Sequence, residues 1–189
     1  PARQAELAWW RQRLAGAPAA LELPTDRPRP AEQRFAGAWL RRPVPAPLVA
    51  AMERCARERG CTPAQVLLAA FKAVLHRYSG AVDVLVGTPV EGRLAVDCER
   101  TVGLFINTLV LRTDLAGDPD FATLLGRVRD TTLDAQARQQ APFEQLVETL
   151  APERSLARNP VFQVMFNRIE MPEPVRRAGG LELCLDQLV

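Results

Sequence analysis

The sequence has 189 residues, of which 48% are apolar and 24% are charged, and its formal net charge at pH 7 is +2. These values are typical of one globular domain, and so small a net charge, spread over scattered arginines, argues against nucleic-acid binding. No apolar run approaches the roughly 18 residues that a membrane span needs, and no secretory leader is evident, so we expect a soluble, cytoplasmic protein.

The first sixty residues predict two helices separated by a rigid connector and a strand. Three prolines in the connector exclude regular backbone hydrogen bonding, and a glycine follows each helix as a stop signal. In chain order we expect a helix over residues 2–15, the extended connector over 21–37, a short strand over 38–44 and a second helix over 47–59.

The third predicted helix carries the clearest local signal. Thr62 is a good N-cap, Pro63 suits the first helical position, and Gln65 completes a capping box. Four large apolar residues then recur at helical spacing before a glycine ends the helix: Leu67, Phe71, Val74 and Tyr78.

The rest of the chain alternates strand-like and helical patterns. Alternating or continuous apolar runs predict strands within residues 83–90, where Gly87 and Pro89 are expected to stop the strand, and over residues 102–111, 161–169 and 181–185. Amphipathic spacing predicts helices over residues 118–140, capped by Asp120, and 142–151. Helices interspersed with strands predict an α/β layered domain, an α+β two-layer sandwich in which helices pack on one mixed sheet.

Three short segments place polar residues where packing alone does not require them. Asn107 and Thr108 lie inside an apolar strand, where an amide or hydroxyl without partners costs roughly 1–3 kcal/mol. The other two segments each contain a proline. Taken singly, each of the three segments has a structural explanation: a strand bulge, an N-cap or a turn. The two proline-containing segments cover residues 138–144, with Glu144 near the free N–H groups of a helix start, and residues 154–160.

The sequence offers little for acid–base or metal chemistry. His76 is the only histidine, and it lies mid-helix without a partner motif, so we expect it to be packed or on the helix surface. The four cysteines show neither a C-x-x-C pair nor a His/Cys ligand spacing, which predicts free thiols in a reducing compartment and no metal site.

In this order, the three segments resemble motifs of the condensation domains of nonribosomal peptide synthetases. The first family motif reads glycine, a hydrophobic residue, Phe, either Val or Ile, Asn and Thr, with an Arg further on. Residues Gly103 through Thr108, together with Arg112, match it. The family's H/N-Q-D-x-P-F-E matches residues 138–144 except at its first and third positions. Its R-D-x-S-R-N-P matches residues 154–160 except at the Asp and Ser positions. Weaker similarity over residues 9–30 and 75–93 extends the resemblance to nearly the whole chain.

The resemblance implies a fold of two lobes, each like one chloramphenicol acetyltransferase protomer, with an active-site tunnel between them. The family joins an upstream carrier-bound acyl or peptidyl thioester to the amine of a downstream carrier-bound aminoacyl thioester. Its catalytic histidine belongs to an H-H-x-x-x-D-G motif in the first lobe, and this sequence has no two adjacent histidines. We therefore expect residues 1–189 to be one domain, the C-terminal lobe, truncated at both ends, without the N-terminal lobe and the last strand and helix.

The resemblance also implies the site and the partners. We expect no catalytic residue, no metal and no cofactor in this lobe, because the substrates arrive on phosphopantetheine arms of carrier proteins. The expected partners are the N-terminal lobe, peptidyl carrier proteins and an adenylation domain, and a dimer could form through the exposed lobe interface. The residues expected to line the tunnel or belong to its motifs are Gly103, Phe105, Asn107, Thr108, Gln139, Pro142, Phe143, Glu144, Arg154, Arg158, Asn159 and Pro160.

Of these residues, Asn107, Gln139 and Asn159 are expected to orient substrate, and residues 91–101 are expected to form part of the tunnel floor. Two alternatives stay open: an epimerisation, cyclisation or other acyltransferase domain of the same fold, and a non-catalytic module that docks carrier proteins. In either case the isolated 189 residues are expected to be inactive.

Overall fold

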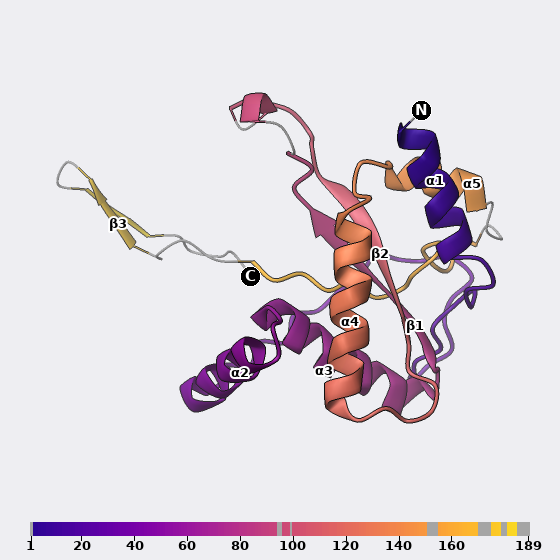
Figure 1. Ribbon diagram of the computed structural model, residues 1–189, viewed down its shortest axis with the longest axis horizontal. Coiled ribbons are helices and arrows are strands. Elements are labelled where there is room, and N and C mark those ends of the chain that lie inside the picture. Colours follow the sequence, from indigo (N-terminus) through magenta and orange to yellow (C-terminus); the bar gives the residue numbers. More distant parts are fainter. Residues whose placement is uncertain are drawn as a thin grey trace.

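The computed structural model describes residues 2–93, 96–98, 100–150, 155–169, 175–178 and 181–184. Along these residues the α-helices and strands come in blocks, and the polypeptide runs from a helical N-terminal region to a short C-terminal hairpin (Figure 1). The α-helices are α1 (Ala2–Arg13), α2 (Ala46–Glu58), α3 (Pro63–Ser79), α4 (Phe121–Gln136) and α5 (Phe143–Leu150). The strands are β1 (Asp83–Val90), β2 (Asn107–Asp114), β3 (Val175–Ala178) and β4 (Leu181–Cys184), and a short 3₁₀ helix covers Val96–Cys98.

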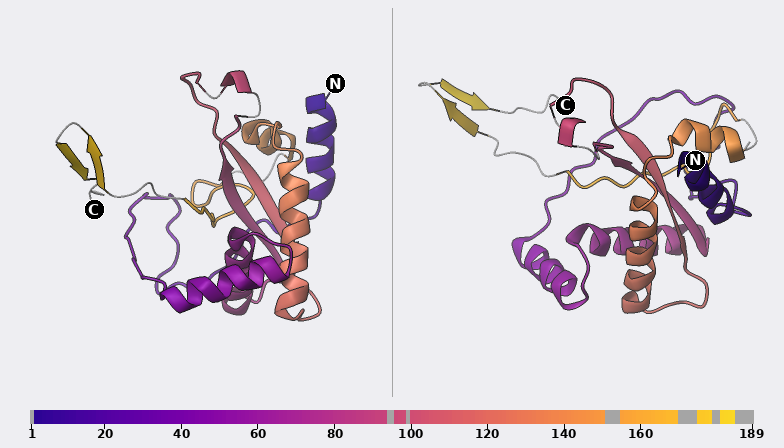
Figure 2. Two further views of the ribbon diagram at one scale, coloured as in Figure 1. Left: turned by 60° about the vertical axis from the view of Figure 1, so that its left-hand side comes forward. Right: turned by 45° about the horizontal axis from the view of Figure 1, so that its top comes forward.

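The central sheet is built on a long antiparallel pair, β1 and β2. Its register runs from Asp83 opposite Asp114 to Val90 opposite Asn107. A third segment joins it in parallel at Gly87, whose N–H donates to Val164 O (3.0 Å) and whose carbonyl accepts from Phe166 N–H (2.9 Å). Helix α4 packs along β2 and against α3, which also contacts β1 (Figures 1 and 2). The expected α+β architecture, with helices packed on a small sheet, is confirmed.

Helix α3 begins as predicted but buries a different face. The Thr62 side chain accepts from Gln65 N–H and the Gln65 side chain accepts from Thr62 N–H, so the capping box is present. The buried residues of the helix are Gln65, Val66, Leu68, Ala69, Lys72 and Leu75. The apolar stripe found in the sequence instead leaves Leu67, Val74 and Tyr78 exposed. Helix α3 is therefore apolar on two sides, and the described residues cover only one of them.

Three predicted strands differ from the structure. Residues 38–44 form no strand, and the chain there is extended with large apolar side chains exposed. Strand β2 begins at Asn107 and not at residue 102, and residues 161–169 contribute only the bridge at Met165. A strand needs a neighbouring backbone that completes its hydrogen bonds. Among the described residues, 38–44 and 102–106 pair with no strand, and 161–169 bond to β1 only around Gly87.

The C-terminal hairpin is separate from the central sheet. Strands β3 and β4 pair only with each other, from Val175 opposite Cys184 to Ala178 opposite Leu181. The predicted strand over 181–185 is confirmed through Cys184, whereas no strand is predicted where β3 lies. Both views in Figure 2 show this hairpin standing away from the helices. No helix among the described residues is long and apolar enough to cross a membrane.

Candidate functional site

Asn107 is the first residue of β2, and its carboxamide connects two of the three polar segments. The side-chain nitrogen donates to the carbonyls of Gln139 and Ala141, both at 2.8 Å. The side-chain oxygen accepts from the N–H groups of Thr108 (2.9 Å) and Phe143 (3.1 Å). All of its donors and acceptors are therefore used, which removes the desolvation cost that a polar residue in an apolar strand would otherwise carry.

The turn between α4 and α5, residues 138–142, is held by a second element as well. Glu6 on α1 accepts through Oε2 from the N–H groups of Gln140 (3.1 Å) and Ala141 (3.0 Å). The indole of Trp10, which is almost completely buried, donates to Arg138 O at 2.9 Å. Side chains from α1 and β2 thus satisfy the backbone of a turn that lies far from both of them in the sequence.

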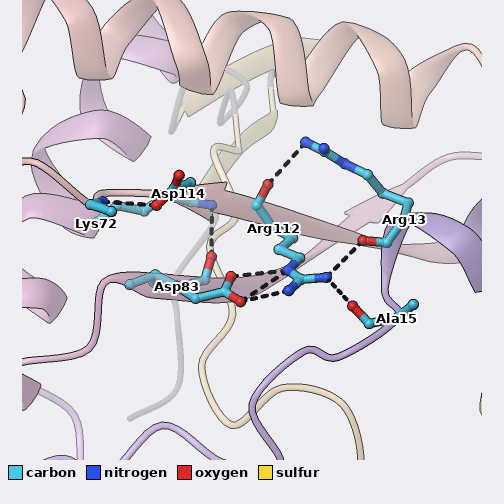
Figure 3. A network of polar contacts seen from close by, with 8 residues as sticks. Arg13, Ala15, Lys72, Asp83, Arg112 and Asp114 are labelled. Carbon is cyan, nitrogen blue, oxygen red and sulfur yellow. Dashed lines mark hydrogen bonds and ion pairs between the residues drawn. The ribbon is translucent and has the colours of Figure 1, made fainter.

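Arg112, the later arginine of the first motif, anchors the opposite end of the sheet (Figure 3). Its guanidinium makes a two-pronged contact with Asp83, with Nε to Oδ1 at 3.0 Å and Nη2 to Oδ2 at 2.7 Å. The remaining nitrogen, Nη1, donates to the carbonyls of Arg13 (2.9 Å) and Ala15 (2.8 Å) at the end of α1. Bidentate guanidinium–carboxylate pairs are geometrically specific, so Arg112 fixes α1 against the β1–β2 pair.

Lys72, the only lysine in the sequence, lies buried between α3 and the sheet close to this network. Its Nζ donates to Leu111 O (2.5 Å) and Thr113 Oγ1 (2.8 Å), and lies 3.4 Å from Val84 O. Burial lowers the pKa of this amine to about 7, although the negative charge of Asp83 opposes the shift. No motif in the sequence singles out this residue.

Between Gly92 and Phe105, the described residues form a loop that folds back on its own base, called here the 92–105 loop. Arg93 lies over the Phe105 ring at 4.2 Å and donates to the carbonyls of Cys98 and Thr101. Gly92 has a φ of +65°, and a Cβ atom there would lie 2.0 Å from Phe105 O. Phe105 therefore closes the loop, while its neighbours Leu104 and Ile106 face solvent.

The third motif lies apart from Asn107. The Arg158 guanidinium forms an ion pair with Glu22 that lowers the pKa of the Glu22 carboxyl and raises the pKa of Arg158. Arg158, Asn159 and Pro160 border a cavity of about 720 Å³ that lies beside α1, α5 and Leu85. Its described lining residues include none from the first two motifs. Just after the third motif, the Phe162 ring packs against the Phe143 ring of the second motif, with centroids 5.4 Å apart.

Some of the expected site residues are held by contacts within the protein, and others have side chains that make no hydrogen bond to the described residues. Asn107 and Arg158 are engaged, Phe105 and Phe143 pack against other side chains, and Pro142 belongs to the held turn. Gly103 is exposed on the 92–105 loop, and Arg154 lies outside the described residues. Four polar side chains make no hydrogen bond to the described part of the chain: Thr108, Gln139, Glu144 and Asn159.

The residues that could support acid–base or metal chemistry are accounted for by packing. His76 Nδ1 lies 2.8 Å from Ala81 O, next to the end of α3, as expected for a packed histidine. Cys55, Cys61 and Cys98 are free thiols, and no cluster of three metal-ligating side chains occurs among the described residues. Glu6, Trp10, Lys72 and Arg93 are the polar anchors that sequence reasoning missed, because each acts on backbone groups that no local pattern identifies.

Comparison with known proteins gives one consistent family. The family model described as "Condensation domain" matches residues 1–173. A linear gramicidin synthase protein of Brevibacillus parabrevis is 51% identical over 178 residues, which is 94% of this chain and 2% of that protein. Phosphinothricin tripeptide synthetase PhsB of Streptomyces viridochromogenes is 47% identical over 174 residues, which is 92% of this chain and 15% of that protein.

Solved structures agree with that similarity. The holo form of AB3403, a four-domain nonribosomal peptide synthetase bound to AMP and glycine, superposes with a TM-score of 0.86 at 26% identity, over 89% of this chain and 13% of that one. The X-domain from teicoplanin biosynthesis superposes with a TM-score of 0.82 at 31% identity, over 86% of this chain and 36% of that one. The chain thus spans only a small share of its relatives.

Proposed function

The chain belongs to the condensation-domain family, and from that premise we propose that it is the C-terminal lobe of a nonribosomal peptide synthetase condensation domain. The proposed parent joins an upstream carrier-bound acyl or peptidyl thioester to the amine of a downstream carrier-bound aminoacyl group. The observation that carries the proposal is the family match over residues 1–173, together with relatives about half identical that are peptide synthetases. A cytoplasmic location stays part of the same proposal.

In the proposed reaction the acceptor amine attacks the thioester carbonyl, a C–N bond forms, and the C–S bond breaks. The amine loses one proton and the departing thiolate gains one. We assign this proton transfer to a histidine outside this chain, because His76 is the only histidine here and is packed beside Ala81. The phosphopantetheine arms belong to the carrier proteins and bring the substrates, so this lobe needs no cofactor of its own.

We propose that this lobe contributes orientation and hydrogen bonding. Holding two tethered reactants in line is worth up to roughly 7–11 kcal/mol in ideal cases. Thr108, Gln139 and Asn159 have side-chain donors free for substrate or for the developing oxyanion. Asn107 orients indirectly in this proposal, because its carboxamide is used to hold the 138–143 backbone. Residues 91–101, part of which Arg93 holds against Phe105, would form part of the tunnel floor.

The test uses the complete condensation domain with donor and acceptor carriers loaded with aminoacyl thioesters. Formation of the carrier-bound dipeptide is followed by mass spectrometry under single-turnover conditions. Gln139→Ala is expected to lower the rate constant about tenfold or more, as for loss of one hydrogen-bond donor to a transition state. Gln136→Ala, an exposed glutamine on the neighbouring helix, is the matched control and is expected to leave the rate unchanged. An unchanged rate in a folded Gln139→Ala domain would remove Gln139 from the site.

The proposed partners are the N-terminal lobe, two carrier proteins and an adenylation domain, and the isolated 189 residues are expected to have no turnover. A specific observation keeps the docking alternative: one similar structure, 31% identical, is a complex of the teicoplanin X-domain with OxyB. Amide formation by the complete domain would exclude a purely docking role. Epimerised or cyclised product, without a new amide, would favour the other acyltransferase relatives.

A further inference from the structure

One face of the N-terminal helix, α1, contacts residues of the first two motifs. Glu6, Trp9, Trp10 and Arg13 recur at helical spacings of three and four residues, so they share one side of α1. Glu6 and Trp10 bond the backbone of the 138–141 turn, and Trp9 lies under the Arg138 guanidinium at 4.1 Å. One helix turn further on, Arg13 O accepts from Arg112.

The contact made by Glu6 is the most directional of these. Two successive backbone N–H groups, those of Gln140 and Ala141, point at the same carboxylate oxygen at 3.1 and 3.0 Å. Consecutive N–H groups converging on one anionic oxygen form a concave anion site, and hydrogen bonds to a charged acceptor are stronger than neutral ones. Asn107, on β2, binds the carbonyls of Gln139 and Ala141 and the N–H of Phe143.

The backbone of the turn is consequently fixed while its neighbouring side chains remain available. The carbonyls of Arg138, Gln139 and Ala141 and the N–H groups of Gln140, Ala141 and Phe143 are all bound by Glu6, Trp10 and Asn107. The Gln139 and Gln140 side chains make no hydrogen bond to the described residues. A fixed backbone that presents free amide groups is the arrangement expected where a polar group must meet a substrate in a defined place.

We propose that Glu6 is a positioning residue for the condensation reaction. It acts by holding the backbone of the 138–142 turn, so that the Gln139 side chain is presented in a fixed orientation. This inference rests on the proposed function. Trp10 and Asn107 also bond the backbone of this turn, whereas Glu6 is the charged acceptor that the described residues offer to its N–H groups. Misplacing a reacting or orienting group by about 1 Å can cost up to roughly a hundredfold in rate.

The experiment compares Glu6→Ala, Glu6→Gln and Glu53→Ala in the complete condensation domain with both loaded carriers. Glu53 is an exposed glutamate on α2 and serves as the matched control. Glu6→Ala is expected to lower the single-turnover rate constant about tenfold, with the KM for the acceptor carrier changed less than about twofold. Glu6→Gln keeps an acceptor oxygen and is expected to recover most of that loss, and Glu53→Ala is expected to match the wild type.

Hydrogen exchange of the turn gives a second readout that does not require turnover. The Gln140 and Ala141 amides are expected to exchange at least about tenfold faster in Glu6→Ala, because opening of the turn then lacks its charged restraint. Faster exchange with an unchanged condensation rate would overturn the proposal and leave Glu6 a structural residue. An unchanged exchange rate of the Gln140 and Ala141 amides would show that Glu6 does not hold the turn, and this result would also overturn the proposal. A wild-type domain that forms no amide would refute the proposed function, and the exchange data would still decide whether Glu6 holds the turn.

Discussion

At the residue scale, Lys72 makes the unfolding free energy depend on pH. The folded state lowers the pKa of this amine to about 7, whereas an unfolded lysine titrates near its usual value of about 10.4. Between these two values the unfolded chain binds more protons than the folded chain, so stability rises with pH across that window. Below pH 7 both states are protonated and the full cost of burying the charge is present.

We predict that Lys72→Met flattens this dependence. In the complete condensation domain, the difference in unfolding free energy between wild type and variant should change by at most roughly 1.4 kcal/mol per pH unit between about pH 7 and 10. The variant should be the more stable protein near pH 7, because methionine removes the buried charge and fills a similar volume. Arg77→Met, on the exposed side of the same helix, is the control and should leave the slope unchanged. Parallel curves for wild type and Lys72→Met in denaturant titrations would contradict the prediction.

Gly92 controls the 92–105 loop through both its backbone angle and the space around it. Its φ of +65° disfavours any side chain, and an added Cβ would lie 2.0 Å from Phe105 O. We predict that Gly92→Ala opens the loop and speeds tryptic cleavage after Arg93 and Arg100 by about tenfold or more. Gly117→Ala is the control, because Gly117 has a φ of +82° but open space around an added Cβ. It carries the backbone strain without the steric clash, so the two effects can be told apart. Equal cleavage of the Gly92→Ala and wild-type domains would show that the loop tolerates a side chain there.

At the scale of elements, the capping box satisfies backbone N–H groups at the start of α3 from within the same segment. Thr62 Oγ1 accepts from Gln65 N–H at 3.2 Å, and Gln65 Oε1 accepts from Thr62 N–H at 2.8 Å. We predict that Thr62→Ala lowers the unfolding free energy of the condensation domain by about 1 kcal/mol, the usual value of a lost N-cap. Thr62→Ser keeps the acceptor oxygen and should cost little. A similar loss in both variants, measured by denaturant unfolding, would assign the effect to the lost methyl group instead.

The same helix shows which part of an element the sequence predicts. The ends of α3 follow from the N-cap, the proline and the glycine stop signal, all of which act within a few residues. The choice of buried face does not follow, because α3 is apolar on two sides and the deeper side also contains Lys72. The strand expected over residues 38–44 fails for a related reason: strand-forming residues need a partner backbone, which no local pattern supplies.

The candidate site divides in the same way. The sequence singled out Asn107 and the 138–144 segment as unusual, and the structure joins them through hydrogen bonds of one carboxamide. Glu6 and Trp10 could not be found from the sequence, because their partners are backbone groups 128 or more residues away. A backbone group carries no sequence signature, so any residue can occupy a position whose N–H or carbonyl is the target.

At the scale of the whole molecule, several large apolar side chains are exposed. Phe35 and Trp39 are each 83% exposed and Leu40 is 79% exposed, all on the extended segment between α1 and α2. The outer side of α3 adds Val74 and Tyr78. Large apolar side chains exposed in such number often mark a surface that another protein part covers, so we expect a further part of the parent protein or another copy to cover them.

We predict that the isolated 189-residue chain associates as its concentration rises. Sedimentation velocity from about 1 to 100 μM should show growing dimer or aggregate, since burying apolar surface yields roughly 25 cal/mol per Å². The double substitution Trp39→Lys and Leu40→Lys should shift the onset to higher concentration, because it replaces two highly exposed apolar side chains with charged ones. Replacing the exposed arginines Arg27 and Arg29 by lysine is the matched control and should leave the onset unchanged. A clean monomer across this range, for the wild-type chain, would mean that the exposed side chains are too dispersed to act as one adhesive surface.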